Sequence, residues 1–495
     1  MSSAFPNIPR TVPKSQLGLL ICVVLTSMAN SCIMGYDSMM MNSLYSLPQF
    51  SGVFTLNSTT VGLYNASMWM GNILSCLVMQ PCADKLGRRP TLVVSACICL
   101  IGVVLQSASQ NIAMFIVSRI VLGFGVEVAG SAAPLLVGEI SPTKYRGLML
   151  GIYFTFFQAG SLVASGVTYG TQHIQSTWAW RVPSILQIVP SLISVIMLIF
   201  VPESPRFMVS RGKIDYARDT LKVANNIDNA EAELLIVEIE KAIALEANVS
   251  PWTSLFKTKP NIHRVLIVIS LALMLELGGS SVVSYYLTFL LEQAGITSTK
   301  TILQINIIMS SWTFFWAVVG ASCFDFTGRK LQSFVCMCGM IISFFVLGGF
   351  VKTYSGSDNT SGQYATVFWM GLFSAFYNFA FTPMNCLYPT EIFPYKTRAS
   401  GTTVFKFFNC GFGLLASFVL SFGMDNLNWK FYILNAGYDI LFLPCIYFLW
   451  VETSKCNLED IAIKFGDLSV DFIESPHSES DVETEEVPGM VSEKN

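Results

Sequence analysis

The sequence contains little charge for its length. Only 12% of its 495 residues are Asp, Glu, Lys or Arg, whereas a soluble domain carries roughly 25%. The shortage is uneven, because apolar runs of about 20 residues carry almost no charge and the short segments between them carry most of it. This distribution is typical of a protein that crosses a membrane several times as helices.

Several classes of function lack their sequence signatures. A net charge of −3 argues against a nucleic-acid partner. The 13 cysteines form no CxxC pair and show no disulfide spacing, so we interpret them as small residues of the apolar runs and expect neither a metal site nor a cofactor. No HExxH, GxSxG or glycine-rich phosphate loop is present, which argues against an enzyme.

Twelve apolar stretches are long enough to cross a bilayer, which predicts an all-α membrane protein with twelve transmembrane helices. The first stretch, which includes Leu17 to Met34, is too long for the apolar core of a signal peptide and is expected to remain as a membrane helix. The predicted spans are residues 16–37, 61–80, 91–109, 112–136, 147–169, 183–201, 264–291, 302–322, 332–351, 365–388, 400–422 and 430–450.

The basic residues predict the orientation of these spans. Of the 29 Lys and Arg, 23 lie on the side of the membrane that holds both termini and four lie on the other side. Loops rich in Lys and Arg face the cytoplasm, so both termini are predicted there. The sequons at Asn57 and Asn359 then lie outside and are weak candidates for glycosylation. No retention signal is visible, which predicts the plasma membrane, with a vacuolar membrane as the open alternative.

The spans divide the chain into five predicted regions. Residues 1–15 form a short cytoplasmic tail, 16–201 a first six-helix half, and 202–263 a charged cytoplasmic linker with two amphipathic helices. Residues 264–450 form the second six-helix half. Residues 451–495 form an acidic, Ser-rich cytoplasmic tail that is predicted to be disordered after Ile473.

Three charged motifs occur once in each half, in matching places. Asp84-Lys-Leu-Gly-Arg-Arg89 recurs as Asp325-Phe-Thr-Gly-Arg-Lys330, and Glu139 with Arg146 recurs as Glu391 with Arg398. Pro202-Glu203-Ser204 after span six has a counterpart in Val451-Glu452-Thr453 after span twelve. The offsets are 241, 252 and 249 residues, which predicts two six-helix halves related by a parallel repeat, as in major facilitator transporters.

These repeated motifs are candidate gating residues. The glycine permits a tight turn, and the flanking charges can pair with acids and bases at the ends of neighbouring helices. Such pairs could latch the halves closed on the cytoplasmic side and break when the protein opens inward; the alternative is ordinary positive-inside charge. The candidates are Asp84, Arg88, Arg89, Glu139, Arg146 and Glu203 in the first half and Asp325, Arg329, Glu391, Arg398 and Glu452 in the second.

An ordered set of motifs carries a family resemblance. The set consists of Gly35-Tyr36-Asp37, Arg119-x-x-x-Gly123-x-Gly125, Pro134-x-x-x-x-Glu139, Pro202-Glu203-Ser204-Pro205-Arg206 and Tyr388-Pro389-x-Glu391. Together these motifs resemble the sugar porter family of the major facilitator superfamily over about residues 16–462, and spans four and ten are most similar to its fungal lactose-permease-like branch.

The resemblance implies proton-coupled uptake of a mono- or disaccharide by alternating access, with the substrate bound near mid-membrane between the halves. Two alternatives stay open, because function depends on the site rather than the scaffold. The protein could carry a non-sugar such as a polyol, a sugar acid or a fungal metabolite, in either direction. It could also be a nutrient sensor that binds without transport. The sequence does not predict an oligomeric state.

Two ionisable residues inside spans are the candidates for proton coupling. Ionisable groups within a membrane are costly and indicate function by default. By resemblance, Asp37 in span one is the proton site and Arg119 in span four is its partner. A carboxylate that faces an arginine is stabilised as the anion, so loss of the pair favours proton uptake. The alternative is that Asp37 is a solvated residue at the outer end of its span.

The resemblance also assigns a substrate site, with departures in span seven. Gln158, Asn409, Tyr285 and Tyr286 match sugar-binding positions of the family. Where the family has a glutamine and an asparagine in span seven, this sequence has Glu276 and Ser281. The family's pocket tryptophans of spans ten and eleven fall at Cys386 and Cys410. These losses leave room for a larger substrate or remove a stacking face.

The roles of three further charged residues stay open at this point. Glu127 lies two turns after Arg119 and either extends the Asp37–Arg119 network or fills a packing site. Lys406 could pair with Glu276 or bind an acidic substrate, but the preferred interpretation is that it extends to the membrane interface from the start of span eleven. Asp439 in span twelve receives no assigned role.

Overall fold

The computed structural model describes residues 9, 11–247, 251–285, 287–293, 295–354, 359–394, 397–454, 456 and 458–466. Within these ranges every regular element is a helix. The helices of the first half are α1 (Gln16–Tyr45), α2 (Pro48–Ser51), α3 (Ser58–Cys76), α4 (Met79–Leu86), α5 (Arg88–Ser107), α6 (Ile112–Ile140), α7 (Thr143–Thr171), α8 (Trp178–Leu186) and α9 (Ile188–Leu198).

The second half repeats this plan after a helical linker. The linker contains α10 (Pro205–Ser210), α11 (Ile214–Asn225), α12 (Asn229–Ala247) and α13 (Pro251–Leu255). The second half contains α14 (Lys259–Leu277), α15 (Ser280–Tyr285), α16 (Leu287–Gln293), α17 (Thr299–Thr327), α18 (Arg329–Tyr354), α19 (Thr360–Ile392), α20 (Arg398–Leu427), α21 (Trp429–Asp439) and α22 (Phe442–Leu449), and α23 (Leu458–Phe465) follows it.

The predicted all-α architecture of twelve membrane-crossing segments is confirmed. Among the described residues, ten segments meet length and hydropathy criteria for crossing a membrane. The two predicted spans outside these ten correspond to α3 and α19, whose polar residues lower their hydropathy. Those polar residues, among them Asn65 and Asn72 of α3 and Ser374 and Asn378 of α19, are buried inside the protein rather than exposed to lipid. Helices that bury polar side chains in this way are suited to line a transport path.

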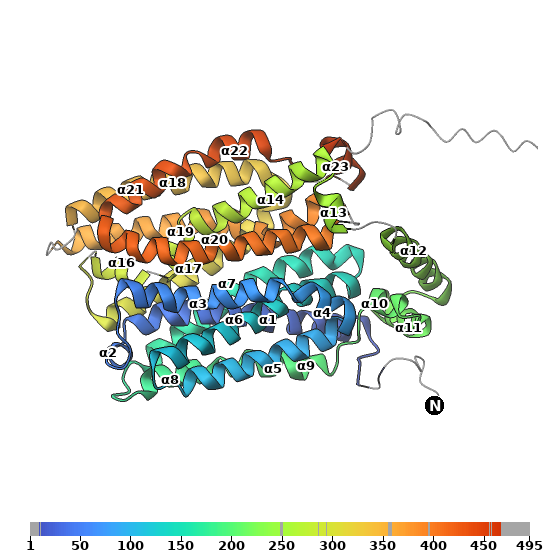
Figure 1. Cartoon of the computed structure of the whole chain (residues 1–495), viewed down its shortest axis with the longest axis horizontal. Coiled ribbons are helices and arrows are strands. Elements are labelled where there is room, and N and C mark those ends of the chain that lie inside the picture. The colour runs from blue at the N-terminus through green and yellow to red at the C-terminus, as the bar shows by residue number, and fades with distance from the viewer. Residues whose placement is uncertain are drawn as a thin grey trace, which may run out of the picture.

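The two halves lie side by side with their helices roughly parallel to one common direction (Figure 1). The linker helices α10 to α13 gather at one end of the molecule, which we call the linker end, and α2, α8 and α16 lie toward the opposite end. The halves meet mainly where α3 packs along α20 and where α7 packs along α17. These four helices therefore form most of the boundary between the halves.

Two glycines allow α1 and α7 to touch backbone to backbone. A Cβ added to Gly35 would lie 1.7 Å from the carbonyl oxygen of Phe157, and one added to Gly160 would lie 2.2 Å from that of Cys32. The Ser161 hydroxyl also donates to the Gly35 carbonyl oxygen over 3.0 Å. The crossing fixes the part of α1 that carries Asp37 against the part of α7 that carries Gln158.

A Gly35→Ala substitution is expected to destabilise the protein, because the new methyl group overlaps a backbone atom that no rotamer change can move. Overpacking of this kind typically costs about 1–3 kcal/mol of unfolding free energy. The measurement is thermal unfolding of the detergent-purified protein. Gly166→Ala is the matched control, since Gly166 lies in the same α7 helix with nothing within 4 Å of its added Cβ. Equal stability of the two variants would contradict the close α1–α7 crossing.

Candidate transport site

A buried ion pair connects α1 to α6 inside the first half. Arg119 Nη2 lies 3.1 Å from Asp37 Oδ2, and Arg119 Nη1 donates to Asp37 Oδ1 over 3.2 Å. Asp37 is 1% exposed and Arg119 is fully buried, which excludes the alternative of a solvated aspartate. The sequence placed these two residues together by resemblance, and the structure brings them into contact.

Two further groups complete the environment of this pair. Gln187, at the junction of α8 and α9, donates from its Nε2 to Asp37 Oδ1 over 3.2 Å, and Arg119 Nε donates to the Tyr64 carbonyl oxygen over 2.8 Å. The carboxylate and the guanidinium therefore balance each other at a site with almost no exposed surface. Sequence analysis missed Gln187, although a glutamine within the otherwise apolar run of span six was a detectable signal.

Gln158 of α7 spans the boundary between the halves. Its Nε2 donates to Asn378 Oδ1 of α19 over 2.6 Å, and its Oε1 accepts from the Thr313 hydroxyl of α17 over 3.2 Å. Nearby on the same helices, the hydroxyls of Ser165 and Ser310 are 2.9 Å apart. The predicted substrate residue therefore lies in an inter-half polar cluster whose other members, Asn378 and Thr313, the sequence analysis missed.

Segment seven, predicted as one span, is broken between α14 and α15. Gly279 adopts a φ of 90°, which favours glycine. The break frees backbone carbonyls that nearby hydroxyls satisfy: Ser280 donates to the Leu275 oxygen over 2.6 Å and Tyr377 donates to the same oxygen over 3.2 Å. Tyr438 donates to the oxygen of Leu277. Irregular backbone at membrane depth occurs where protein groups satisfy it in this way.

The break places Glu276 and Ser281 beside α20. The Ser281 hydroxyl donates to Glu276 Oε2 over 3.4 Å, and Asn409 of α20 lies near this carboxylate. Three of the predicted substrate residues thus form one buried group in the second half. The side chain of Tyr285 and the whole of Tyr286 lie outside the described residues.

Lys406 does not extend to the membrane interface, so the preferred interpretation of this residue is wrong. Its Nζ lies 3.2 Å from Glu127 Oε1, and the two side chains are 16% and 2% exposed. Glu127 belongs to α6 of the first half and Lys406 to α20 of the second, so the pair crosses the boundary between the halves. A buried acid within reach is a better partner for the ammonium than the distant interface. The sequence could not indicate this pairing, because it depends on which helix faces meet.

The repeated charged motifs form one cluster in each half at the linker end. In the first half, Arg88 contacts Glu139 through Nε and Nη2, both at 3.0 Å. Glu203 accepts from the backbone N–H of Arg88 over 3.0 Å and also from that of Arg89. Burial raises the pKa of the Glu203 carboxyl group above its usual value, and these hydrogen bonds offset only part of that increase. Asp84 lies 3.7 Å from Arg88 and is 57% exposed.

The second half repeats this arrangement. Arg329 donates from Nη2 and Nε to Glu391 over 2.8 and 3.2 Å, and Glu452 accepts from the backbone N–H groups of Arg329 and Lys330, each over 2.9 Å. Arg398 donates from its Nε to the Phe393 oxygen over 3.4 Å. The side chains of Arg146 and Asp325 lie outside the described residues.

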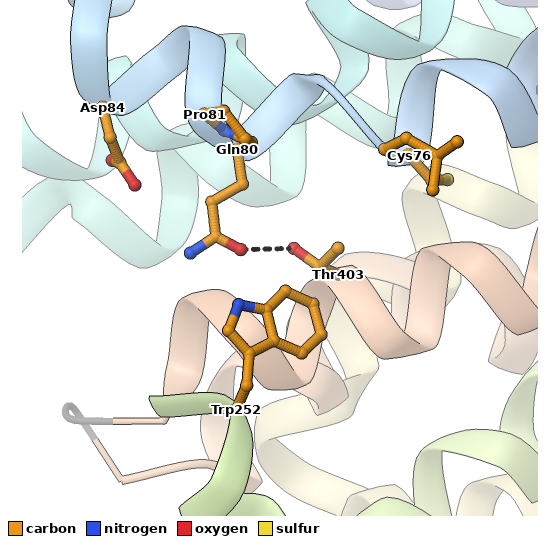
Figure 2. A pocket seen from close by; sticks show the side chains of 7 residues that line it. Cys76, Gln80, Pro81, Asp84, Trp252 and Thr403 are labelled. Carbon is orange, nitrogen blue, oxygen red and sulfur yellow. Dashed lines mark hydrogen bonds between the residues drawn. The ribbon is translucent and has the colours of Figure 1, made fainter. Parts of the chain in front are cut away.

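Each of these clusters joins helix ends within one half. The predicted pairing of repeated acids and bases is therefore present, but the contacts described for it do not run from one half to the other. At the linker end a hydrogen bond does cross the boundary: the Thr403 hydroxyl of α20 donates to Gln80 Oε1 of α4 over 3.3 Å (Figure 2). This inter-half contact involves two residues, Gln80 and Thr403, that the sequence did not single out.

A pocket of about 440 Å³ lies beside the Gln80–Thr403 contact. Figure 2 shows Trp252 of the linker helix α13 below this hydrogen bond, Asp84 of α4 to one side and Cys76 of α3 to the other. The pocket is lined by Cys76, Leu77, Gln80, Pro81, Asp84, Trp252 and Thr403. Since it draws on both halves and on the linker, it occupies the place where a path between the halves would reach the linker end.

At the opposite end, α1 contacts the second half. Asn42 Oδ1 accepts from the Thr288 backbone N–H over 3.0 Å, and the Thr288 hydroxyl donates to the Asn42 carbonyl oxygen over 2.7 Å. The Thr299 hydroxyl donates to the Ser46 oxygen over 3.1 Å. Contacts therefore join the halves at both ends of the boundary.

The two predicted glycosylation residues are both exposed helix caps. Asn57 Oδ1 accepts from the Thr60 backbone N–H at the start of α3 over 2.9 Å, and Asn359 Oδ1 accepts from that of Gly362 at the start of α19 over 3.3 Å. Both helices begin at the end of the molecule opposite the linker. Their location agrees with a common side of the membrane and leaves glycosylation as a prediction.

Comparison with known proteins places this geometry in a family. The family described as "Sugar (and other) transporter" matches residues 22–465. The "MFS-type transporter criB" of Aspergillus cristatus is 28% identical over 456 residues, which cover 91% of this chain and 94% of that protein. The "High-affinity glucose transporter" of Kluyveromyces lactis is 26% identical, with 90% and 84% covered.

Solved structures show the same fold. The proton:xylose symporter XylE bound to 6-bromo-6-deoxy-D-glucose matches with a TM-score of 0.75 and 22% identity, and the match covers 91% of this chain and 100% of that one. A partially occluded inward-open conformation of XylE from E. coli matches with a TM-score of 0.73 and 21% identity, covering 89% and 99%. At these identities the likeness establishes the arrangement of helices.

Proposed function

The chain belongs to the "Sugar (and other) transporter" family, and from this premise we propose that it carries a sugar across the membrane together with protons by alternating access. The observation that carries the proposal is the buried Asp37–Arg119 ion pair. The backbone contact between Gly35 and Phe157 joins this pair to the inter-half polar cluster around Gln158. The named functions of the relatives and of XylE support the same reading, since they include a glucose transporter and a proton:xylose symporter.

In this proposal the sugar binds between the halves. The sugar hydroxyls take the place of hydrogen bonds that these protein groups now make with one another. The groups are Gln158, Asn378 and Thr313 of the inter-half polar cluster, and Asn409 and Ser281 of the second half. Amide and hydroxyl groups suit this exchange, because each can donate and accept as the sugar hydroxyls do. Tyr285, Tyr286 and Glu276 belong to the proposed site by their place in segment seven.

Proton coupling follows from the balance of charge at Asp37. As an anion the carboxylate neutralises Arg119 and ties α1 to α6. A proton on Asp37 removes that attraction and leaves Arg119 to its backbone partner at Tyr64. The coupled change is therefore a shift of α1 relative to α6, which alters the boundary that α1 and α7 form with the second half.

We also propose the orientation and the gating residues. The linker end is cytoplasmic, as the excess of Lys and Arg there predicts, and the membrane is the plasma membrane. The Arg88–Glu139 and Arg329–Glu391 clusters keep the helix ends of each half in register while the halves rock. Glycans on Asn57 or Asn359 would then face outside.

One observation favours a second candidate function. Glu127, Lys406 and Glu276 place three ionisable groups near Asn409, which is more charge than a neutral sugar requires. A sugar acid, a polar non-sugar or a fungal metabolite would use such a lining, with Lys406 as the group that binds an anion. In this conformation the Lys406 ammonium already pairs with Glu127, so its charge is balanced without an anionic substrate. A neutral sugar is therefore the first proposal.

The test of this function is substrate-induced alkalinisation of the medium by cells that express the protein in a background deficient in sugar uptake. Hexoses, disaccharides, polyols and uronic acids are offered in turn. Alkalinisation with hexoses or disaccharides is the expected result. A response to uronic acids alone would replace the first proposal by the second. No response to any solute, with surface expression confirmed, would overturn proton symport of all four classes.

A further inference from the structure

Two buried acids and a partly buried lysine lie near one another where the two halves touch. Lys406 of α20 lies 3.2 Å from Glu127 of α6, and α14, which carries Glu276, packs along α20. Asn409, one turn after Lys406 on α20, lies near Glu276. The lysine therefore has an acid from the first half in direct contact and a second acid from its own half nearby.

The ion pair lies close to the linker-end pocket. Thr403, which lines the pocket and contacts Gln80, is one turn before Lys406 on α20. Cys76 lines the same pocket and also packs in a small apolar cluster with Val128 and Cys410. Val128 is the neighbour of Glu127, and Cys410 is one turn after Lys406. This cluster and the ion pair beside it therefore adjoin the pocket.

Separation of the halves at this point must break the pair. Glu127 moves with the first half and Lys406 with the second, and a buried charge without a partner is strongly unfavourable. The second half contains a replacement partner, because Glu276 belongs to that half and lies on α14, which packs along the α20 helix of Lys406. Glu127 instead faces the space that opens, where water can solvate it.

We propose that the Glu127–Lys406 pair is the inner gate of the transport path and that the gate opens when Lys406 transfers from Glu127 to Glu276. Lys406 is then the moving element and Glu276 the residue that receives it. The proposal rests on the proposed function only in taking the protein to work by alternating access, and it holds whichever solute is carried. The same transfer would explain why segment seven has a glutamate where sugar porters are expected to have a glutamine.

The experiment measures how fast Cys76 reacts with a membrane-impermeant maleimide applied from the linker end of the protein in membrane vesicles. Cys76 is buried in the closed arrangement and lines the pocket that would widen. Mass spectrometry of the peptide that contains Cys76 separates its labelling from that of the other cysteines. Cys82, half-buried in α4, is the internal reference.

Opposite changes are expected from the two acids. Glu127→Gln weakens the closed pair, so labelling of Cys76 is expected to be several-fold faster than in the wild type. Glu276→Gln removes the receiving partner, so Lys406 stays on Glu127 and labelling is expected to be several-fold slower. A general loss of stability could speed labelling in both variants but could not slow it in one of them.

A double variant tests whether the two residues act as a pair. Lys406→Gln alone is expected to speed labelling, and Glu127→Gln with Lys406→Gln is expected to give the same rate as either single change rather than the product of both effects. The control is Arg218→Gln, which removes an ion pair with Asp215 and Glu233 inside the linker and should leave the Cys76 rate unchanged.

Faster labelling in Glu276→Gln, no change in Glu127→Gln, or multiplicative effects in the double variant would each overturn the gate. None of these readouts requires a transported solute. Failure of the gate is therefore distinguishable from failure of the sugar proposal. If only the sugar proposal fails, no sugar causes alkalinisation but the expected labelling pattern of Cys76 is still observed.

Discussion

An Asp37→Asn variant is expected to carry sugar without protons. The amide keeps the size of the side chain but can neither balance Arg119 nor take up a proton, so the change at the α1–α6 contact no longer depends on protonation. Sugar-induced alkalinisation should vanish, and sugar should equilibrate across the membrane instead of accumulating. Two linked binding sites typically change each other's affinity about 5- to 150-fold. We therefore expect the sugar affinity of the wild type to depend on external pH and that of Asp37→Asn not to depend on it.

The measurement compares net uptake, alkalinisation and exchange of labelled for unlabelled sugar in the same cells. Exchange should persist in Asp37→Asn, because it does not require the carboxylate to release its proton. Asp215→Asn is the matched control, since Asp215 is an exposed linker aspartate paired with Arg218, and it should behave as the wild type. Retained alkalinisation in Asp37→Asn would place the proton site elsewhere.

A Gln158→Ala variant is expected to lose sugar affinity. Gln158 offers a donor and an acceptor at the boundary of the halves, where Asn378 and Thr313 now occupy both. Two hydrogen bonds of about 0.5–1.5 kcal/mol each correspond to a rise in KM of about 5- to 150-fold. The measurement is the concentration dependence of uptake at fixed surface expression.

Gln172→Ala provides the control for this substitution. Gln172 caps the same α7 helix and donates to the Tyr169 oxygen over 2.8 Å, away from the inter-half cluster. Its KM should equal that of the wild type. If Gln158→Ala left KM unchanged, the substrate site would have to lie away from the α7–α17–α19 contact.

The periodic and compositional features of the sequence predicted the fold well, because each depends on one segment at a time. Apolar runs predict spans, and repeated charged motifs predict two related halves. The Arg88–Glu139 and Arg329–Glu391 contacts follow from the same logic, since tight turns place those residues at adjacent helix ends. The break at Gly279 was predicted as continuous helix, although the paired glycines at 278 and 279 were a signal for it.

Contacts between helices distant in sequence were harder to predict. The Glu127–Lys406 pair requires knowledge of which faces of α6 and α20 meet, and residue spacing within one helix carries no such information. The same holds for Asn378 and Thr313, whose short polar side chains resemble many others in the spans. Asp37 and Arg119 were placed together only because a family resemblance supplied the pairing.

The glycine crossing of α1 and α7 has a thermodynamic consequence. Gly35 stands two residues before Asp37, and the backbone it touches, at Phe157, adjoins Gln158. Asp37, the proposed proton residue, and Gln158, the proposed sugar residue, thus belong to two helices whose backbones touch and cannot slide past each other freely. Any displacement caused at one is felt at the other, without an intervening chain of side chains. Because such linkage is reciprocal, the factor by which a proton tightens sugar binding must equal the factor by which sugar tightens proton binding.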